Sequence, residues 1–283
     1  MATLIQTLQH TLDMNPSLLP ETKRILLKQA LQSHVLDFIY NHPQYRRLNF
    51  YGGTCLHVVY DLNRLSEDLD FDNMAGTDLS ALADDLAGLF RKVQTPAEVK
   101  SQRGENQILR LTVKLPILNQ LGLSIHPNEA LHLKVEISHH RQTAVLQNTP
   151  VFYLGRSFVP SHFSLETMMA GKMLACLERN FQRGREGAFI KGRDYYDLLW
   201  FLQKGIQPLK EKLASDGNTP YSGALKVCRW TFNFAAEVNV NPKKSAKRPS
   251  FSPPRHKIRI FASKSSTTFE CSHPSCGKSF PSP

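Results

Sequence analysis

The chain has 283 residues, of which 41% are hydrophobic, enough for one large folded domain or two small ones. No stretch approaches the roughly 20 consecutive apolar residues of a membrane span, and the start lacks a basic region followed by an apolar run. We therefore expect a cytoplasmic protein with no membrane part. Five scattered cysteines also suit the cytosol, where thiols stay reduced.

The net charge of +11 is unevenly distributed along the chain. Residues 1–205 hold 22 Lys and Arg against 20 Asp and Glu, whereas residues 206–283 hold 13 against 4. A basic segment of this kind indicates an anionic partner such as nucleic acid, or a solvated, disordered extension. Both interpretations stay open.

The first two predicted parts are N-terminal helices over residues 1–45 and an α/β core over 46–160. From Pro20 to about Tyr40, apolar residues recur at helical spacing. The core is predicted to contain a strand, a glycine turn, a short helix, a loop and a second strand over 48–73, followed by a helix over 79–93. Two segments that alternate apolar and polar side chains, 108–115 and 131–137, predict half-buried strands.

A helical part follows over residues 161–205, with helices predicted over 164–181 and 194–203. Residues 206–283 form a basic tail rich in Pro and Ser, which we expect to be disordered or foreign to the rest. Its boundary falls between about 206 and 220. The predicted fold class is α/β (α+β), with a mixed sheet core, flanking helices and a C-terminal helical part.

Two carboxylates, Asp68 and Asp70, are the main chemical feature of the sequence. In an extended strand their side chains point to the same side, while Leu69 points to the other. A divalent cation reverses the repulsion between two such carboxylates, and Mg²⁺ or Mn²⁺ prefers oxygen ligands and substrate phosphates. Glu136, on the polar face of a later predicted strand, is the best third ligand of a two-metal site for displacement at phosphorus.

Gly52, Gly53 and Thr54 lie between a predicted strand and a short helix. The glycines allow close backbone approach, and the helix N-terminus offers N–H groups to phosphate oxygens. A GGT sequence alone is a weak signal, as is Asp-Leu-Asp alone. Their combination, in this order and with a third carboxylate on a later strand, is much more specific.

These motifs resemble the AbiEii/AbiGii toxin family of nucleotidyltransferases, within the polymerase-beta-like superfamily. The resemblance covers about residues 20–205 and rests on GGT, on R-x-S-E-D-L-D-F (64–71), on LKVEIS (133–138) and on GRDYYDL (192–198). It implies a nucleotide-binding loop at the GGT, metal ligands at the two aspartates, and further active-site roles for Lys172 and Asp194. It also implies transfer of a nucleotide from an NTP to an acceptor, RNA such as tRNA among them, and a separate antitoxin protein.

Helical spacing supports part of this assignment. Lys172 and Arg179 share one face of the predicted helix and can hold phosphate groups, so we expect both in the nucleotide site. Asp194 and Asp197 share a face of the next helix; the alternative is ordinary solvated ion pairing. Gly171 departs from the family, which usually has glutamate there.

Cys55 and His57 also depart from the family, and we interpret them as packing residues because they face different ways on a helix. Near the C-terminus, Cys271 and Cys276, the second of which begins a CGKSF run, resemble the first half of a C₂H₂ zinc finger. The second half is absent and His273 is poorly placed as a third ligand, so a zinc site is not expected.

The sequence thus predicts a metal-dependent nucleotidyltransferase with catalytic residues Asp68, Asp70, Glu136, Lys172 and Asp194. One alternative is a phosphotransferase of the same fold, because a triphosphate site does not reveal which phosphorus is attacked. Another is an inert nucleic-acid-binding protein with a basic tail. The sequence does not specify the NTP, the acceptor or the oligomeric state.

Overall fold

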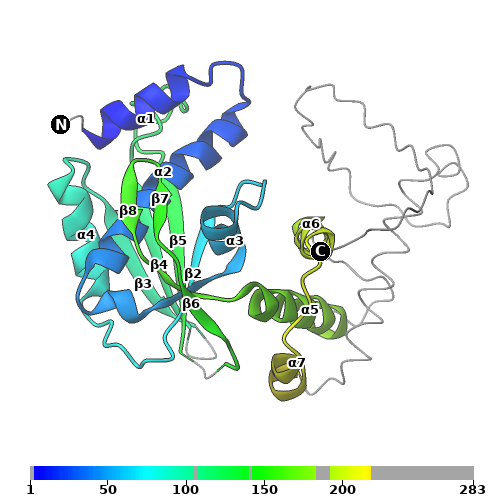
Figure 1. The fold of residues 1–283 in the computed structure, drawn as a ribbon. Coiled ribbons are helices and arrows are strands. Elements are labelled where there is room, and N and C mark those ends of the chain that lie inside the picture. The colour runs from blue at the N-terminus through cyan, green and yellow to red at the C-terminus, as the bar shows by residue number, and fades with distance from the viewer. Residues whose placement is uncertain (1–2, 105–107, 140–141, 183–191, 218–283) are drawn as a thin grey trace, which may run out of the picture. The chain divides into compact units, whose positions relative to one another are not determined.

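In the computed structural model, a seven-stranded mixed sheet forms the centre of the described chain, which comprises residues 3–104, 108–139, 142–182 and 192–217. The strand order is β3-β4-β5-β2-β1-β9-β6, and a separate hairpin pairs β7 with β8 (Figure 1). The strands are β1 (Asn49–Tyr51), β2 (Asp68–Asp72), β3 (Glu98–Arg103), β4 (Leu109–Leu115), β5 (Leu131–Ser138), β6 (Leu146–Asn148), β7 (Val151–Tyr153), β8 (Arg156–Phe158) and β9 (Ser161–Phe163). The mixed α/β class predicted from the sequence is confirmed.

Alternating side chains give the sheet one apolar and one polar face. In β4 and β5 every second residue is buried, as the sequence pattern predicted. β2 pairs in parallel with β5, which sets Leu69 beside Val135 on the apolar face and Asp70 beside Glu136 on the other. The predicted carboxylates therefore lie on the same face of two neighbouring strands.

The N-terminal helices are α1 (Leu4–Asp13) and α2 (Pro20–Asn41), followed by the 3₁₀ turn Tyr45–Arg47. A capping box between Thr3 and Gln6 starts α1, and Pro20 occupies the first turn of α2 as predicted. α2 packs on β5, and α4 (Leu82–Lys92) packs on β3 and β4. α4 begins three residues later than the predicted start at 79.

β1 runs directly into α3 (Gly52–Tyr60), so the two glycines form the first helical turn instead of a separate loop. The C-terminal helices are α5 (Leu165–Gln182), α6 (Gly192–Gln203) and α7 (Lys210–Gly217). α5 packs against both α6 and α7 (Figure 1). None of the helices in the described ranges is long and apolar enough to span a membrane.

The beginning of the predicted tail differs from expectation. Residues 210–217 form α7, whose Leu213 is fully buried, and the Leu209 N–H donates to the Glu166 carbonyl at 2.9 Å. The eight residues of α7 are too few to show a clear apolar periodicity in the sequence. The tail can therefore begin only after Gly217, and residues 218–283, including Cys271 and Cys276, lie outside the described residues.

Candidate active site

The junction of β1 and α3 requires glycine for two reasons. Gly52 has a φ of +80°, in the left-handed region, and a Cβ atom there would lie 2.2 Å from Asp70 Oδ2. At Gly53 a Cβ atom would lie 2.5 Å from Arg64 Nη2. The absence of side chains at these two positions thus lets a carboxylate and a guanidinium approach the backbone at the start of α3.

The N-terminus of α3 has backbone donors that face a cavity. Its N-cap residue, Tyr51, makes no side-chain capping hydrogen bond, so the first-turn N–H groups keep their donor capacity. Both Gly52 and Gly53 line a cavity. Thr54 does not line it: its fully buried hydroxyl donates to the Asp68 carbonyl and lies 2.9 Å from Ser66 Oγ. Thr54 therefore supports β2, which differs from the direct nucleotide contact expected from the sequence.

The two aspartates of β2 repel each other. Burial, then the charge of Asp68, raises the pKa of Asp70 to about 7, with a smaller contribution from Glu136 and opposition from Lys172 and Arg64. The third aspartate of the strand, Asp72, is fully buried and accepts hydrogen bonds from Ser138 and Gln142, each at 3.0 Å. Asp72 therefore fixes the strand, while the repulsion between Asp68 and Asp70 is only partly offset by the charges of Lys172 and Arg64.

Glu136 lies beside Asp70 in the β2–β5 register, as the proposed third ligand should. Its carboxylate accepts a hydrogen bond from Arg110 Nε at 3.2 Å, however, and it is 38% exposed. Glu136 does not line the cavity that contains Asp70. The structure thus brings Glu136 to the right strand position but gives its carboxylate a different partner.

The donor set fits a hard divalent cation at Asp68 and Asp70. These two carboxylates supply oxygen ligands, and a cation would offset both the burial of the Asp70 charge and its repulsion by Asp68, the two causes that raise the pKa of Asp70. Across the described ranges, no three His, Cys, Asp or Glu side chains are arranged to hold a metal ion. A cation bound here would therefore take its remaining ligands from water or substrate oxygens.

A buried ionic network joins α5, α6 and the loop before β2. Lys172 Nζ lies 3.2 Å from Asp194 Oδ1 and 2.9 Å from Asp197 Oδ2. Arg64 makes a bidentate contact with Asp197, at 2.6 and 2.7 Å. Asp197 is fully buried, and although burial alone would raise its pKa, its hydrogen bonds and charge interactions with Arg64 and Lys172 hold the pKa below its usual range.

Sequence reasoning underestimated Arg64 and Asp197. Both lie within the quoted motifs, Arg64 at the start of R-x-S-E-D-L-D-F and Asp197 within GRDYYDL, but neither was included among the site residues. The available signal was a single arginine in the first motif and an aspartate without an assigned role in the second. Their contact spans 133 residues of sequence, so only the fold brings them together.

A cavity of about 580 Å³ lies beside Asp70. It is lined by residues from the start of α3, from β2, from α5 and from α6, and its charged walls include Asp70, Lys172 and Asp194. The cavity is of a size typical for small-molecule sites. Five of the predicted site residues therefore meet at one cavity: Gly52, Gly53, Asp70, Lys172 and Asp194.

The remaining candidate residues have different positions. Cys55 is fully buried, and burial followed by the charge of Asp70 raises the pKa of its thiol, which agrees with a packing role. His57 lies 2.9 Å from the Leu62 carbonyl and 3.0 Å from Gln29, so it too has structural partners. Arg179 belongs to α5, but its side chain is not among those the structure describes.

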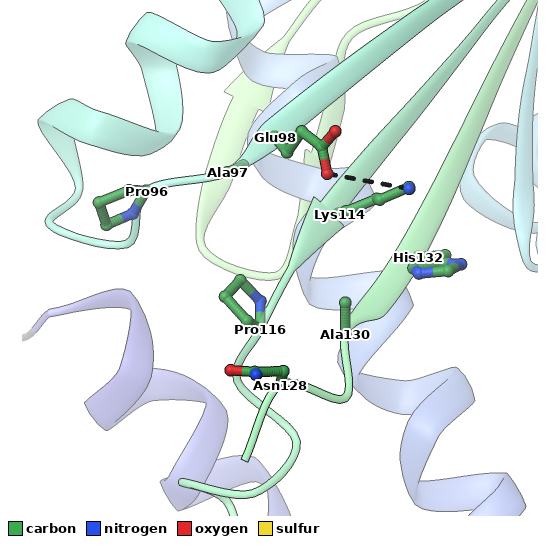
Figure 2. Close-up of a pocket in the computed structure, with 8 residues that line it drawn as sticks. All are labelled: Pro96, Ala97, Glu98, Lys114, Pro116, Asn128, Ala130 and His132. Atoms are coloured by element: carbon green, nitrogen blue, oxygen red, sulfur yellow. Dashed lines mark ion pairs between the residues drawn. The ribbon is translucent and has the colours of Figure 1, made fainter. Parts of the chain in front are cut away.

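A second hollow lies at the ends of β3, β4 and β5, and Figure 2 shows the eight residues around it. Its volume is about 560 Å³, and Glu98 pairs with Lys114 across it at 3.8 Å. None of the predicted site residues lines it. The cavity beside Asp70 is therefore the better candidate for the active site.

Comparison with known proteins gives an independent result. The sequence profile of the family described as "Nucleotidyl transferase AbiEii toxin, Type IV TA system" matches residues 37–253. No curated protein matches the chain. A crystal structure of a "putative nucleotidyltransferase from H. pylori" is 21% identical in sequence to this chain. The match covers 63% of this chain and 68% of that protein, with a TM-score of 0.41.

Proposed function

Because the chain belongs to the AbiEii nucleotidyltransferase toxin family, we propose that the cavity beside Asp70 binds an NTP and a divalent cation and transfers the nucleotide to an RNA acceptor. One observation carries the proposal. A single cavity combines a glycine-only helix N-terminus, a carboxylate of an aligned pair and a lysine. These are the groups that a triphosphate and its cation require.

Each wall of the cavity has a distinct role in this proposal. The N–H groups of Gly52 and Gly53 donate to phosphate oxygens, and the absent side chains let the phosphates approach the backbone. Lys172 supplies a point charge to the triphosphate. Asp194 and Asp197 orient that ammonium, which they already contact at 3.2 and 2.9 Å.

Asp68 and Asp70 would hold Mg²⁺ or Mn²⁺, with Glu136 joining them only if Arg110 releases it. The bound cation would stabilise negative charge on the reacting phosphate oxygens. The protein's own part is to align the triphosphate between α3 and α5 and to keep the two carboxylates on one side of β2.

The proposed RNA acceptor rests on chemistry and charge, and the proposed antitoxin partner rests on the family description. RNA is the proposed acceptor because its hydroxyl groups can attack the α-phosphorus, and because the segment after residue 205 is strongly basic. The family description names a type IV toxin–antitoxin system, so we propose a cognate antitoxin as a functional partner.

The test is incubation of the protein with total RNA and each α-labelled NTP in Mg²⁺. We expect label in RNA, and we expect Asp68→Asn and Asp70→Asn each to retain less than about a tenth of it, because a lost metal ligand removes several kcal/mol of transition-state stabilisation. Asp61→Asn is the matched control: Asp61 is exposed and adopts a φ of 59°, which Asn tolerates well.

The other outcomes decide between the rival functions. Label only from a γ-labelled NTP would indicate a phosphotransferase. Salt-sensitive RNA binding with neither label would indicate an inert binding protein. Neutralising Asp70 should not unfold the metal-free protein, because the charge is unfavourable there; a lower unfolding temperature for Asp70→Asn in EDTA would contradict this account of the strand.

A further inference from the structure

A lysine of α7 lines the candidate nucleotide cavity. It does not belong to any of the sequence motifs described above. Lys212 lines the same cavity as Asp70 and Lys172, and only 4% of its surface is exposed. Burying an ammonium group is unfavourable unless it is paired. The position of Lys212 therefore has to be explained by its contacts.

Two protein groups hold the Lys212 ammonium. Asp216, one turn later in α7, accepts at 2.6 Å, and Gln142 Oε1 accepts at 3.3 Å. Within the described part of the chain these contacts use two of the three N–H donors of the ammonium. The third donor is available to a ligand in the cavity.

Gln142 connects Lys212 to the strand that carries the metal carboxylates. Its amide nitrogen donates to Asp72 Oδ1 at 3.0 Å and to Ser138 Oγ at 3.2 Å, while its carbonyl oxygen accepts from Lys212. The Lys212 ammonium is thus held at a defined place relative to β2. A lysine that only anchored α7 would not need this connection to Asp72.

The side chain of Lys212 packs against α5 at Gly171. A Cβ atom at Gly171 would lie 3.6 Å from Lys212 Cε, so the lysine stem packs directly over this position, next to Lys172 in sequence. α7 itself comes close to α5, because a Cβ atom at Gly217 would lie 2.2 Å from Leu174 Cδ2. The close packing of the two helices brings two lysines to one cavity.

We propose that Lys212 is a second phosphate-binding cation of the nucleotide site, held ready by Asp216 and Gln142. This inference rests on the proposed function and extends it to a residue that the motifs do not contain. Lys172 and Lys212 approach the cavity from α5 and α7, so a triphosphate between them is contacted by a cation from each helix. Asp216 and Gln142 are positioning residues, because they act through Lys212.

The experiment compares NTP use by Lys212→Met, by the charge-balanced Lys212→Met/Asp216→Asn variant and by Lys212→Arg. The double variant leaves no unpaired carboxylate, so it separates phosphate binding from folding. We expect KM for the NTP to rise about tenfold in both methionine variants, with a smaller change in kcat and partial rescue by arginine. Lys210→Met, an exposed lysine of the same helix, is the matched control.

A binding measurement gives a second readout. Inorganic tripolyphosphate with Mg²⁺ should raise the unfolding temperature of the wild type and of Lys210→Met, and raise that of the double variant much less. A purely structural Lys212 would give the double variant a wild-type KM and a wild-type tripolyphosphate response.

The two proposals fail in different ways. If the wild type neither labels RNA nor responds to tripolyphosphate, the proposed nucleotide site is wrong. If the wild type does both and Asp70→Asn removes the labelling, while the double variant behaves as Lys210→Met does, only the role of Lys212 is wrong.

Discussion

Asp197→Asn tests the ionic network that joins the two sequence motifs. Asp197 is fully buried and accepts from Arg64 at 2.6 and 2.7 Å, and it lies 2.9 Å from Lys172. The side chains of Arg64 and Lys172 are only 13% and 20% exposed. Asparagine keeps the shape but removes the charge, so two largely buried cations lose their shared partner.

Breaking a buried ion pair by removing one partner costs about 3 to 5 kcal/mol. Asp194 still contacts Lys172, so we expect the lower end, about 3 kcal/mol, of lost unfolding free energy. For a folded unit of this size that corresponds to a fall of roughly 6 to 12 °C in the unfolding temperature. Glu98→Gln is the control: Glu98 is 61% exposed and pairs with Lys100 and Lys114, which are 52% and 25% exposed, so its ion pairs should contribute little.

The unfolding free energy lost in Asp197→Asn should also depend on pH. The pKa of Asp197 is held below its usual range in the folded protein, so its contribution is fully present above about pH 4 and disappears as the pH falls further. The difference between wild type and Asp197→Asn, measured by urea unfolding at several pH values, should therefore shrink under acid conditions. Equal stabilities of Asp197→Asn and Glu98→Gln at neutral pH would refute the network.

Three further predictions concern other parts of the chain. Gly52→Ala should cost about 1 to 2 kcal/mol from the left-handed φ alone and should remove labelling activity by displacing Asp70, from which the new Cβ would be 2.2 Å away; wild-type labelling by this variant would contradict the geometry. His34 is 8% exposed, and burial, then the charge of Arg156, lowers its pKa to about 4 against the opposing charge of Asp37. Stability should thus be full above about pH 6.5 and fall by up to about 3 kcal/mol toward pH 4, and His34→Gln should remove that part of the pH dependence in urea titrations. A chain that ends at Gly217 should keep the thermal transition of the whole protein, whereas one that ends at Gly205 should unfold at a lower temperature because it lacks α7; a collapse of the longer chain would show that later residues belong to the fold.

Local periodicity in the sequence was enough to predict several elements of the fold. The alternation in 108–115 and 131–137 predicted two half-buried strands, and the helical spacing after Pro20 predicted α2. Side-chain alternation also placed Asp68 and Asp70 on one side of their strand. The strands of three residues, β6 to β9, and the eight-residue α7 were missed because so few residues show no clear period.

The contacts between these elements depend on the tertiary structure. The parallel register of β2 and β5 brings Glu136 beside Asp70. The Glu136 carboxylate, however, accepts a hydrogen bond from Arg110 on the neighbouring strand. The Arg64–Asp197 pair and the entry of Lys212 into the cavity depend on helix packing between segments far apart in sequence. Long-range contacts of this kind leave no periodic signal in the chain, since each is selected by the packing of whole elements and not by the spacing of neighbouring residues.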